Sequence, residues 1–180
     1  MTELPFSSPV AVRKLPARGT VVNYNAPDDV RAAIAADFDL ISIDVFEAQA
    51  RVSPWKKQGV QISGSICAEL TQACAITGEP LSTTVREEID ALYVPEGSKL
   101  AQPVVDGEGE IVLDPEAADP PETFNGDIIE LAQIWLEFLA LGLDPFARQK
   151  GAQLPDTSND LSGEDARTSP FAVLASLKKR

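Results

Sequence analysis

The sequence of 180 residues contains no histidine, and this absence excludes several classes of catalyst. Without histidine, the chain alone cannot form a Ser-His-Asp triad, a Cys-His pair or a His-ligated zinc site. General acid–base chemistry would be left to Asp, Glu, Lys, Tyr or Cys. The P-loop, G-x-G-x-x-G and G-x-S-x-G motifs are absent as well. We therefore expect no enzymatic activity and no cofactor.

Cysteine is scarce: Cys67 and Cys74 are the two in the sequence. Two cysteines do not make a disulfide framework, which favours a reducing compartment. They are seven residues apart and would face opposite sides of a shared strand, so we expect no bridge between them. Free cysteine is among the most buried residue types, so Cys67 is expected to be structural. Cys74 stands at a strand end beside a turn, where a reactive thiol would lack a histidine base.

Long apolar runs are also missing. The N-terminal residues have no apolar core of signal-peptide length, and no uninterrupted apolar run approaches the ~20 residues that span a bilayer. We expect a soluble, cytoplasmic protein without a membrane partner.

Basic residues are outnumbered, with 15 Lys and Arg against 28 Asp and Glu and a net charge of −13. Because phosphate binding depends on Lys and Arg, this balance disfavours nucleic-acid binding over the whole surface. The cations fall mainly in three groups: Arg13, Lys14 and Arg18; Arg148 and Lys150; and residues 178–180. They either converge into one basic patch or stay scattered, and both alternatives remain open. Trp55 beside Lys56 and Lys57 could stack on a base.

Alternating apolar residues predict strands in the first half of the chain. One strand is expected where Ile41, Ile43 and Val45 alternate with Ser42, Asp44 and Phe46 on the other face, and another over 82–94. Between them, a third has one apolar face, made of Val60, Ile62, Ile66, Ala68 and Leu70. The face expected for residues 82–94 consists of Val85, Ile89, Ala91 and Tyr93. The short links favour antiparallel pairing, and valines near residues 10–12 and 21–22 predict short edge strands.

Two main helices are expected. One begins at Pro27 and runs to Asp37, with an apolar stripe of Val30, Ile34 and Phe38. The other is expected to be capped by Asp127, with Glu130 at capping-box spacing, and to end at Gly142. Its apolar face would comprise Ile128, Leu131, Trp135, Phe138 and Leu139. A short C-terminal helix is predicted to start at Pro170.

Together these patterns predict an α+β fold in a single domain over residues 1–180. The sheet is expected to be antiparallel, or a partly open barrel, with about four to six strands packed by two main helices. Residues 95–126 are acidic and rich in Pro and Gly, and predict a flexible excursion with a short strand at 111–113. The acids there are not spaced as a calcium-binding loop, so we expect no metal site. Residues 152–168 predict a polar linker.

Two blocks of the sequence resemble the YceD family. The first is the segment Gln72–Leu81, QACAITGEPL, which is similar to the family's central signature. The second starts with DPPE at residues 119–122 and DIIEL at 127–131, and continues through EFLALGLDPFAR at 137–148 to KGA at 150–152. It resembles the pattern of alphaproteobacterial members. Thr77 replaces the second cysteine of some members, and Ala147 replaces a proline, which is expected to loosen that turn.

The resemblance implies a role in ribosome biogenesis, in accumulation and processing of the large-subunit 23S rRNA, with no established reaction. Ribosomal proteins or pre-ribosomal large-subunit particles are the expected partners, RNA contact through a local basic face stays open, and no DNA partner is expected. We expect the interaction surface to lie on two loops, at Cys74, Thr77, Glu79, Pro80, Asp144, Pro145, Arg148 and Lys150. The alternative is an RNA-processing enzyme, such as a nuclease whose carboxylates hold a metal ion.

Overall fold

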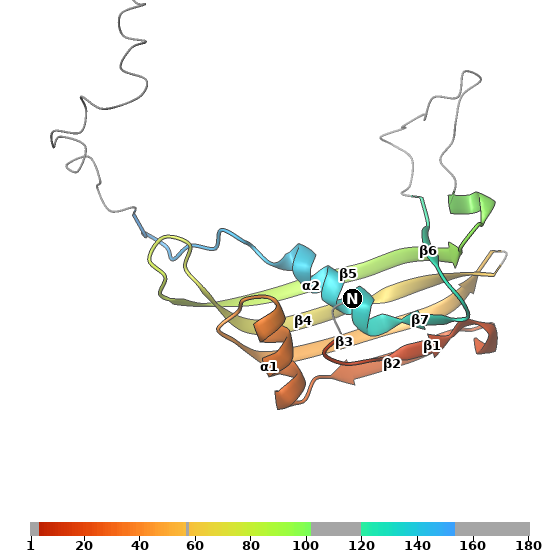
Figure 1. Ribbon diagram of the computed structural model, residues 1–180, viewed down its shortest axis with the longest axis horizontal. Coiled ribbons are helices and arrows are strands. Elements are labelled where there is room, and N and C mark those ends of the chain that lie inside the picture. The colour runs from red at the N-terminus through yellow and green to blue at the C-terminus, as the bar shows by residue number, and fades with distance from the viewer. Residues whose placement is uncertain (1–3, 57, 102–119, 154–180) are drawn as a thin grey trace, which may run out of the picture.

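The computed structural model describes residues 4–56, 58–101 and 120–153 (Figure 1). Its main element is a five-stranded sheet in the order β2-β3-β4-β5-β6. The bounds of these strands are β2 Thr20–Asn25, β3 Ser42–Trp55, β4 Gly59–Ala73, β5 Pro80–Pro95 and β6 Glu122–Phe124. Pairing is antiparallel from β2 to β5, and β6 is parallel to β5. The predicted α+β class is confirmed, and the sheet is open, with β2 and β6 at its edges.

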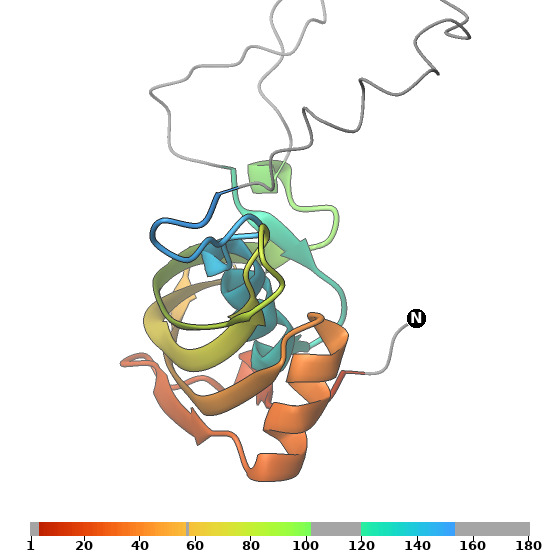
Figure 2. The same ribbon diagram turned by 90° about the vertical axis from the view of Figure 1, so that its left-hand side faces the viewer.

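A two-stranded sheet and two helices complete the fold. A separate antiparallel pair joins β1, Pro9–Ala11, to β7, Ile128–Glu130. The helices are α1, Asp28–Asp37, and α2, Leu131–Gly142, with 3-10 turns η1 at Val12–Lys14 and η2 at Lys99–Ala101. In the end-on view the curved strands wrap around α2 (Figure 2). No helix in the described part of the chain is long and apolar enough to cross a membrane.

The expected strand patterns are largely confirmed. All five apolar residues assigned to the inner face of β4 are buried, and so are Val85, Ile89 and Tyr93 on β5. Ala91 is half-buried against the same core. These inner faces pack against α2, whereas the polar residues between them are wholly or partly exposed.

The expected face of β3 is wrong beyond its first residues. Ile43 is buried, as predicted, but Ile41 is exposed and Phe46, assigned to the other face, is fully buried. The pairing with β4 shifts between Ile43 and Val45. An extra residue at such a bulge reverses the alternation of side chains along the strand. The inner face therefore continues as Phe46, Ala48, Ala50 and Val52.

The ends of the helices also differ from expectation. Pro27 is the N-cap of α1 rather than its first residue. Asp127 does not cap α2, because Ile128–Glu130 pair with β1 before the helix begins. The cap is Glu130, whose carboxylate accepts from Ala132 N and also from Ser7 Oγ and Ser8 N. Ile128 is consequently exposed, whereas Leu131, Trp135 and Leu139 are fully buried.

An aromatic cluster joins α2 to the N-terminal segment and the sheet. The Phe6 ring stacks on Tyr24 of β2 with 4.4 Å between centroids, and Tyr24 stacks on Trp135 at 5.8 Å. Phe46 of β3 meets the edge of Phe6 at 6.2 Å. Aromatic pairs at such distances add to the stabilisation from burial alone. Residues from four separate parts of the chain therefore fix the position of α2.

Residues 95–126 are more ordered at their ends than expected. β5 extends to Pro95, η2 follows it, and β6 begins at Glu122. Glu96 N donates to Phe124 O, which ties the two ends of this segment together. The predicted strand at 111–113, most of the linker at 152–168 and the helix from Pro170 lie outside the described residues.

Replacement of Glu130 by alanine should destabilise the junction of β7 and α2. It removes the cap of α2 and leaves the donors of Ser7 and Ser8 without their partner. We expect the free energy of unfolding to fall by about 1–2 kcal/mol, as measured by urea denaturation. Glu137→Ala is the matched control, because Glu137 is exposed on the same helix. Equal effects of both variants would contradict this role.

Gly64 marks the closest approach of β3 and β4. A Cβ atom there would collide with the carbonyl oxygen of Gln49 and the Cα of Ala50, both backbone atoms. We expect Gly64→Ala to lower the free energy of unfolding by about 3 kcal/mol, since a packed strand pair cannot move apart locally. The exposed neighbour Ser65 provides the control, and Ser65→Ala should stay within about 0.5 kcal/mol. A fully stable Gly64→Ala protein would show that the strands can separate at this position.

Candidate functional site

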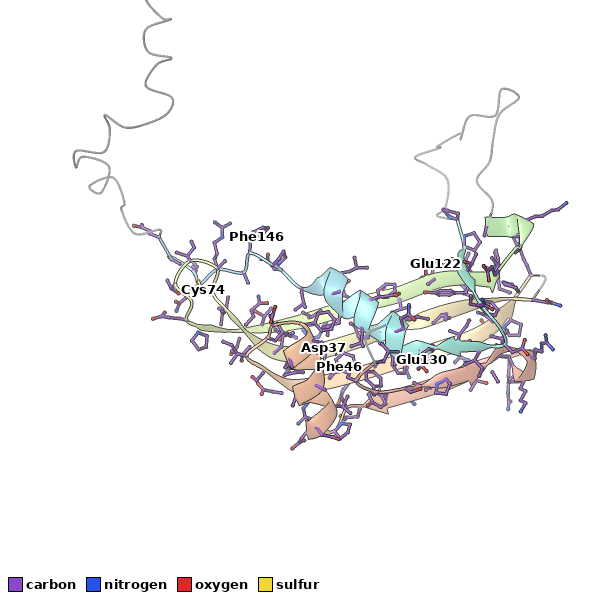
Figure 3. All side chains as sticks on the ribbon, in the orientation of Figure 1. Asp37, Phe46, Cys74, Glu122, Glu130 and Phe146 are labelled. Atoms are coloured by element: carbon purple, nitrogen blue, oxygen red, sulfur yellow. The ribbon has the colours of Figure 1, made fainter. Side chains whose placement is uncertain are left out.

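The two loops predicted to form an interaction surface meet at one end of the sheet. Residues 74–79 connect β4 to β5, and residues 143–149 follow α2. Ala75 N donates to Ala147 O at 2.8 Å, and Gln72 Nε2 donates to Asp144 O at 3.4 Å. Cys74 and Phe146 lie close to each other at this end (Figure 3). We call this surface, residues 74–80 and 141–150, the two-loop end.

Each loop is held by its own hydrogen bonds. In the first, Cys74 N donates to Glu79 O and Gly78 N donates to Cys74 O, both at 2.8 Å. Gly78 adopts a φ of 72°, in the left-handed region that glycine reaches without strain. In the second, the Asp144 carboxylate accepts from Phe146 N at 2.9 Å, as in an Asx turn. The surface is therefore built on two compact turns.

Ala147 shows why the second turn is not loosened by the loss of proline. Its N–H donates to Asp144 O at 3.3 Å, a bond that proline could not make. Its carbonyl accepts from Ala75, and the residue is buried between the loops. The expectation of a looser turn was wrong, because it considered the turn without the neighbouring loop.

Cys74 is the buried centre of this junction. Its side chain is 2% exposed, and Sγ accepts a hydrogen bond from Gln149 N at 3.4 Å. The pKa of the thiol is lowered to about 6 by that bond and by bonds from the hydroxyl and N–H of Thr77 and from Ile76 N, with desolvation opposing them. Donors aimed at sulfur favour the thiolate. The Cys74 side chain therefore links the two loops, and its lowered pKa favours the thiolate.

The expectation for Cys67 was wrong in its burial. Cys67 is half-exposed on the outer face of β4, because its position alternates with the buried residues Ile66 and Ala68. It borders a shallow hollow of about 500 Å³. Both cysteines are free, which confirms that they are not bridged.

The other predicted site residues lie at the surface. Thr77, Glu79, Pro80, Asp144, Pro145, Arg148 and Lys150 are all exposed. Sequence reasoning missed two neighbours, Phe146 and Leu141, whose side chains are 71% and 78% exposed. The exposure of Phe146 could have been predicted from its position in a Pro-containing turn. A turn has no repeating apolar face that packs on the core, so an apolar side chain there tends to be exposed. Exposed apolar side chains framed by charged ones are typical of protein-contact surfaces.

The predicted groups of cations do not converge. Arg13, Lys14 and Arg18 lie around η1, at the end of the sheet where β4 begins, whereas Arg148 and Lys150 lie where β4 ends (Figure 1). β4 has 15 residues, and a strand of that length extends roughly 45 Å. Residues 178–180 lie outside the described part of the chain.

The nuclease alternative requires several side chains that are grouped closely enough to hold a metal ion. Within residues 4–56, 58–101 and 120–153, no three His, Cys, Asp or Glu side chains are grouped so that they could hold a metal ion. The alternative stays a prediction without a supporting arrangement in this part of the chain.

The geometry defines an α+β protein with an open, mostly antiparallel sheet and a two-loop surface around the buried Cys74 side chain. Comparison with protein-family models, curated proteins and solved structures gives no match for this chain. The likeness to YceD therefore stays a resemblance carried by the sequence motifs.

The Cys74 thiolate predicts a specific pH dependence of stability. The folded pKa of about 6 lies below the ordinary thiol pKa of 9.0. The unfolded chain therefore binds a proton that the folded chain has released, and stability rises with pH between these two values. This contribution is complete above the upper value and is lost as the pH falls through about 6.

Urea midpoints across this range should rise in the wild-type protein relative to Cys74→Ala. Cys67→Ala is the matched control and should rise together with the wild type. Parallel profiles of the wild type and Cys74→Ala would contradict the thiolate assignment.

Proposed function

We propose that this protein is a cytoplasmic ribosome biogenesis factor of the YceD type. It would support accumulation and processing of 23S rRNA by binding ribosomal proteins, RNA or pre-ribosomal large-subunit particles. The observation that supports this most is the junction at the two-loop end. The two sequence blocks that resemble YceD are separate in the chain, yet their backbones are hydrogen-bonded to each other between Ala75 and Ala147, which are 72 positions apart. Shared motifs that meet on one surface are expected when that surface carries the function.

The chemistry of the two-loop end favours a protein partner. Phe146 and Leu141 expose large apolar side chains, and aromatic side chains of this kind dominate the energy of protein interfaces. Glu79, Asp144, Arg148 and Lys150 surround them with charges of both signs. The rigid turns beneath reduce the entropy that would be lost on binding. Basic ribosomal proteins would also be attracted by the net charge of −13.

Phe146→Ser should weaken capture of large-subunit components. We expect pull-downs with ribosomal proteins and large-subunit RNA to lose about tenfold or more of the bound material, as for an interface hot spot. The measurement is made over a series of salt concentrations, with thermal unfolding to verify that the variant is folded. Val21→Ser is the matched control, because Val21 is an exposed apolar residue on the edge strand β2.

Depletion of the protein followed by gradient profiles tests the cellular role. Large-subunit particles should decrease after depletion and recover with the wild-type chain or Val21→Ser, but not with Phe146→Ser. Profiles that do not change after depletion would contradict the proposed function. Capture that is equal for wild type and Phe146→Ser would contradict the assignment of the surface.

A further inference from the structure

We propose that the opposite end of the sheet binds single-stranded RNA. This surface, here called the turn end, comprises residues 12–20, 51–56, 58–61, 93–101 and 122–127. It contains η1, the turn between β3 and β4, the end of β5 with η2, and β6. The identification of the ligand as RNA rests on the proposed role in ribosome biogenesis. The surface itself is defined by its charge and its shape.

Charge is divided unequally between the turn end and the rest of the molecule. The described residues of the turn end hold six cations and three acids, whereas the other described residues hold four cations and fourteen acids. The six cations are Arg13, Lys14, Arg18, Arg51, Lys56 and Lys99. A local excess of Lys and Arg provides the phosphate contacts that a net charge of −13 would otherwise oppose. Among the described residues, phosphate groups would therefore find most of their cationic contacts at this end.

A hollow lies among these cations. It has a volume of about 570 Å³, and its charged and polar border consists of Arg13, Lys56, Gln58 and Asp127. Its apolar walls come from η1, the ends of β3 to β5, and β6, through Val12, Leu15, Pro54, Val60, Pro95 and Phe124. Ligand sites commonly have volumes of about 300–1,000 Å³, with apolar walls and a few polar groups that fix orientation. An unstacked base with its phosphate matches both features.

The cations at the rim of the hollow could exchange their present contacts for contacts with a phosphate. Arg13 Nε pairs with Asp127 at 2.7 Å, but the two side chains are 79% and 52% exposed. Exposed ion pairs of this kind contribute little to stability, so a phosphate could replace the carboxylate at small cost. Lys56 Nζ lies 4.4 Å from the centroid of the Trp55 ring, on the strand end beside the hollow. An aromatic face next to a cation is the combination on which bases of single strands stack.

Two residues of the turn between β3 and β4 have side chains, although their backbone angles are ones that glycine adopts with less strain. Lys56 and Gln58 have φ values of 38° and 66°, in the left-handed region. Non-glycine residues there carry a conformational cost that recurs at binding sites. The turn therefore keeps polar side chains at the rim of the hollow despite this cost.

A single strand fits this end better than the other anionic partners. The bases of a duplex are stacked and cannot reach an apolar hollow or an aromatic ring. An acidic peptide would satisfy the cations but would leave the Trp55 face and the apolar walls without flat partners. The apolar and aromatic contacts thus favour unstacked bases, as in a loop or an unpaired stretch of precursor rRNA.

The test measures binding of the purified full-length chain to a labelled single-stranded RNA of about 16 nucleotides. Affinity is followed between about 50 and 200 mM salt. For the double variant Arg13→Gln/Lys56→Gln we expect an affinity at least about tenfold lower at the lowest salt. The slope of log affinity against log salt should also become shallower by about 1.4, because each single-strand phosphate contact contributes about 0.7. Trp55→Leu should lower affinity by about tenfold through lost stacking.

Arg86→Gln is the control for the single variant Lys56→Gln, since Arg86 is an exposed cation of β5 that belongs to neither end of the sheet and does not border the hollow. Its affinity should stay within about twofold of wild type, because exposed charges more than a Debye length from the ligand are screened. No binding at low salt, equal losses in Arg86→Gln and Lys56→Gln, or equal competition by polyglutamate and RNA would each overturn the proposal.

Failure of this inference can be distinguished from failure of the proposed function. If the turn end does not bind RNA but depletion still reduces large-subunit particles, only the RNA surface is wrong. If RNA binds as expected but depletion leaves the gradient profile unchanged, the surface stands and the ribosomal role is wrong.

Discussion

Burial of α2 along the inner face of the sheet is the contact on which the rest of the fold depends. Three strands of 14 to 16 residues present a long apolar surface, and that surface requires a cover. Leu131, Trp135 and Leu139 are completely buried in this contact, and each such side chain contributes roughly 1.5–3 kcal/mol. The same helix orders its neighbours, because Trp135 packs on the Phe6 and Tyr24 rings and Glu130 binds Ser7 and Ser8. The N-terminal segment is thus fixed by residues more than a hundred positions later in the chain.

Long strands also separate the surfaces at their two ends. The turns that join β3 to β4 and β4 to β5 are a full strand length apart, so loops at one end do not contact loops at the other. This separation places exposed apolar side chains and the buried Cys74 side chain at the two-loop end, and cations around a hollow at the turn end. A protein partner and an RNA strand could then be held at the same time without competing for one surface.

Much of the local structure could be predicted from the sequence, and the errors have identifiable causes. Alternation along β4 and β5 was confirmed because a single apolar face is sufficient to define a half-buried strand. The face of β3 failed at Phe46, because a bulge shifts the register without leaving a mark in the pattern. The start of α2 failed at Asp127 because three residues after it pair with β1, a contact that no local rule includes. Cys67 was expected to be structural but is half-exposed, because the burial of a thiol depends on what covers it in the folded chain.

The sequence by itself determined much of the local structure: the alternation along β4 and β5, and the ends of α1 and α2 at Asp37 and Gly142. It also determined that histidine chemistry is absent and which two blocks carry the resemblance to YceD. These features depend on residues that are close together in the sequence, so the periodicity and composition of a short segment are sufficient to predict them. Only the tertiary structure decided which groups meet. Cys74 receives a donor from Gln149, and Lys56 reaches the same hollow as Arg13, whereas Arg13 and Arg148 end far apart. The physical reason is that strand length, register and the packing of α2 set these distances, and they are properties of the assembled sheet rather than of any one segment.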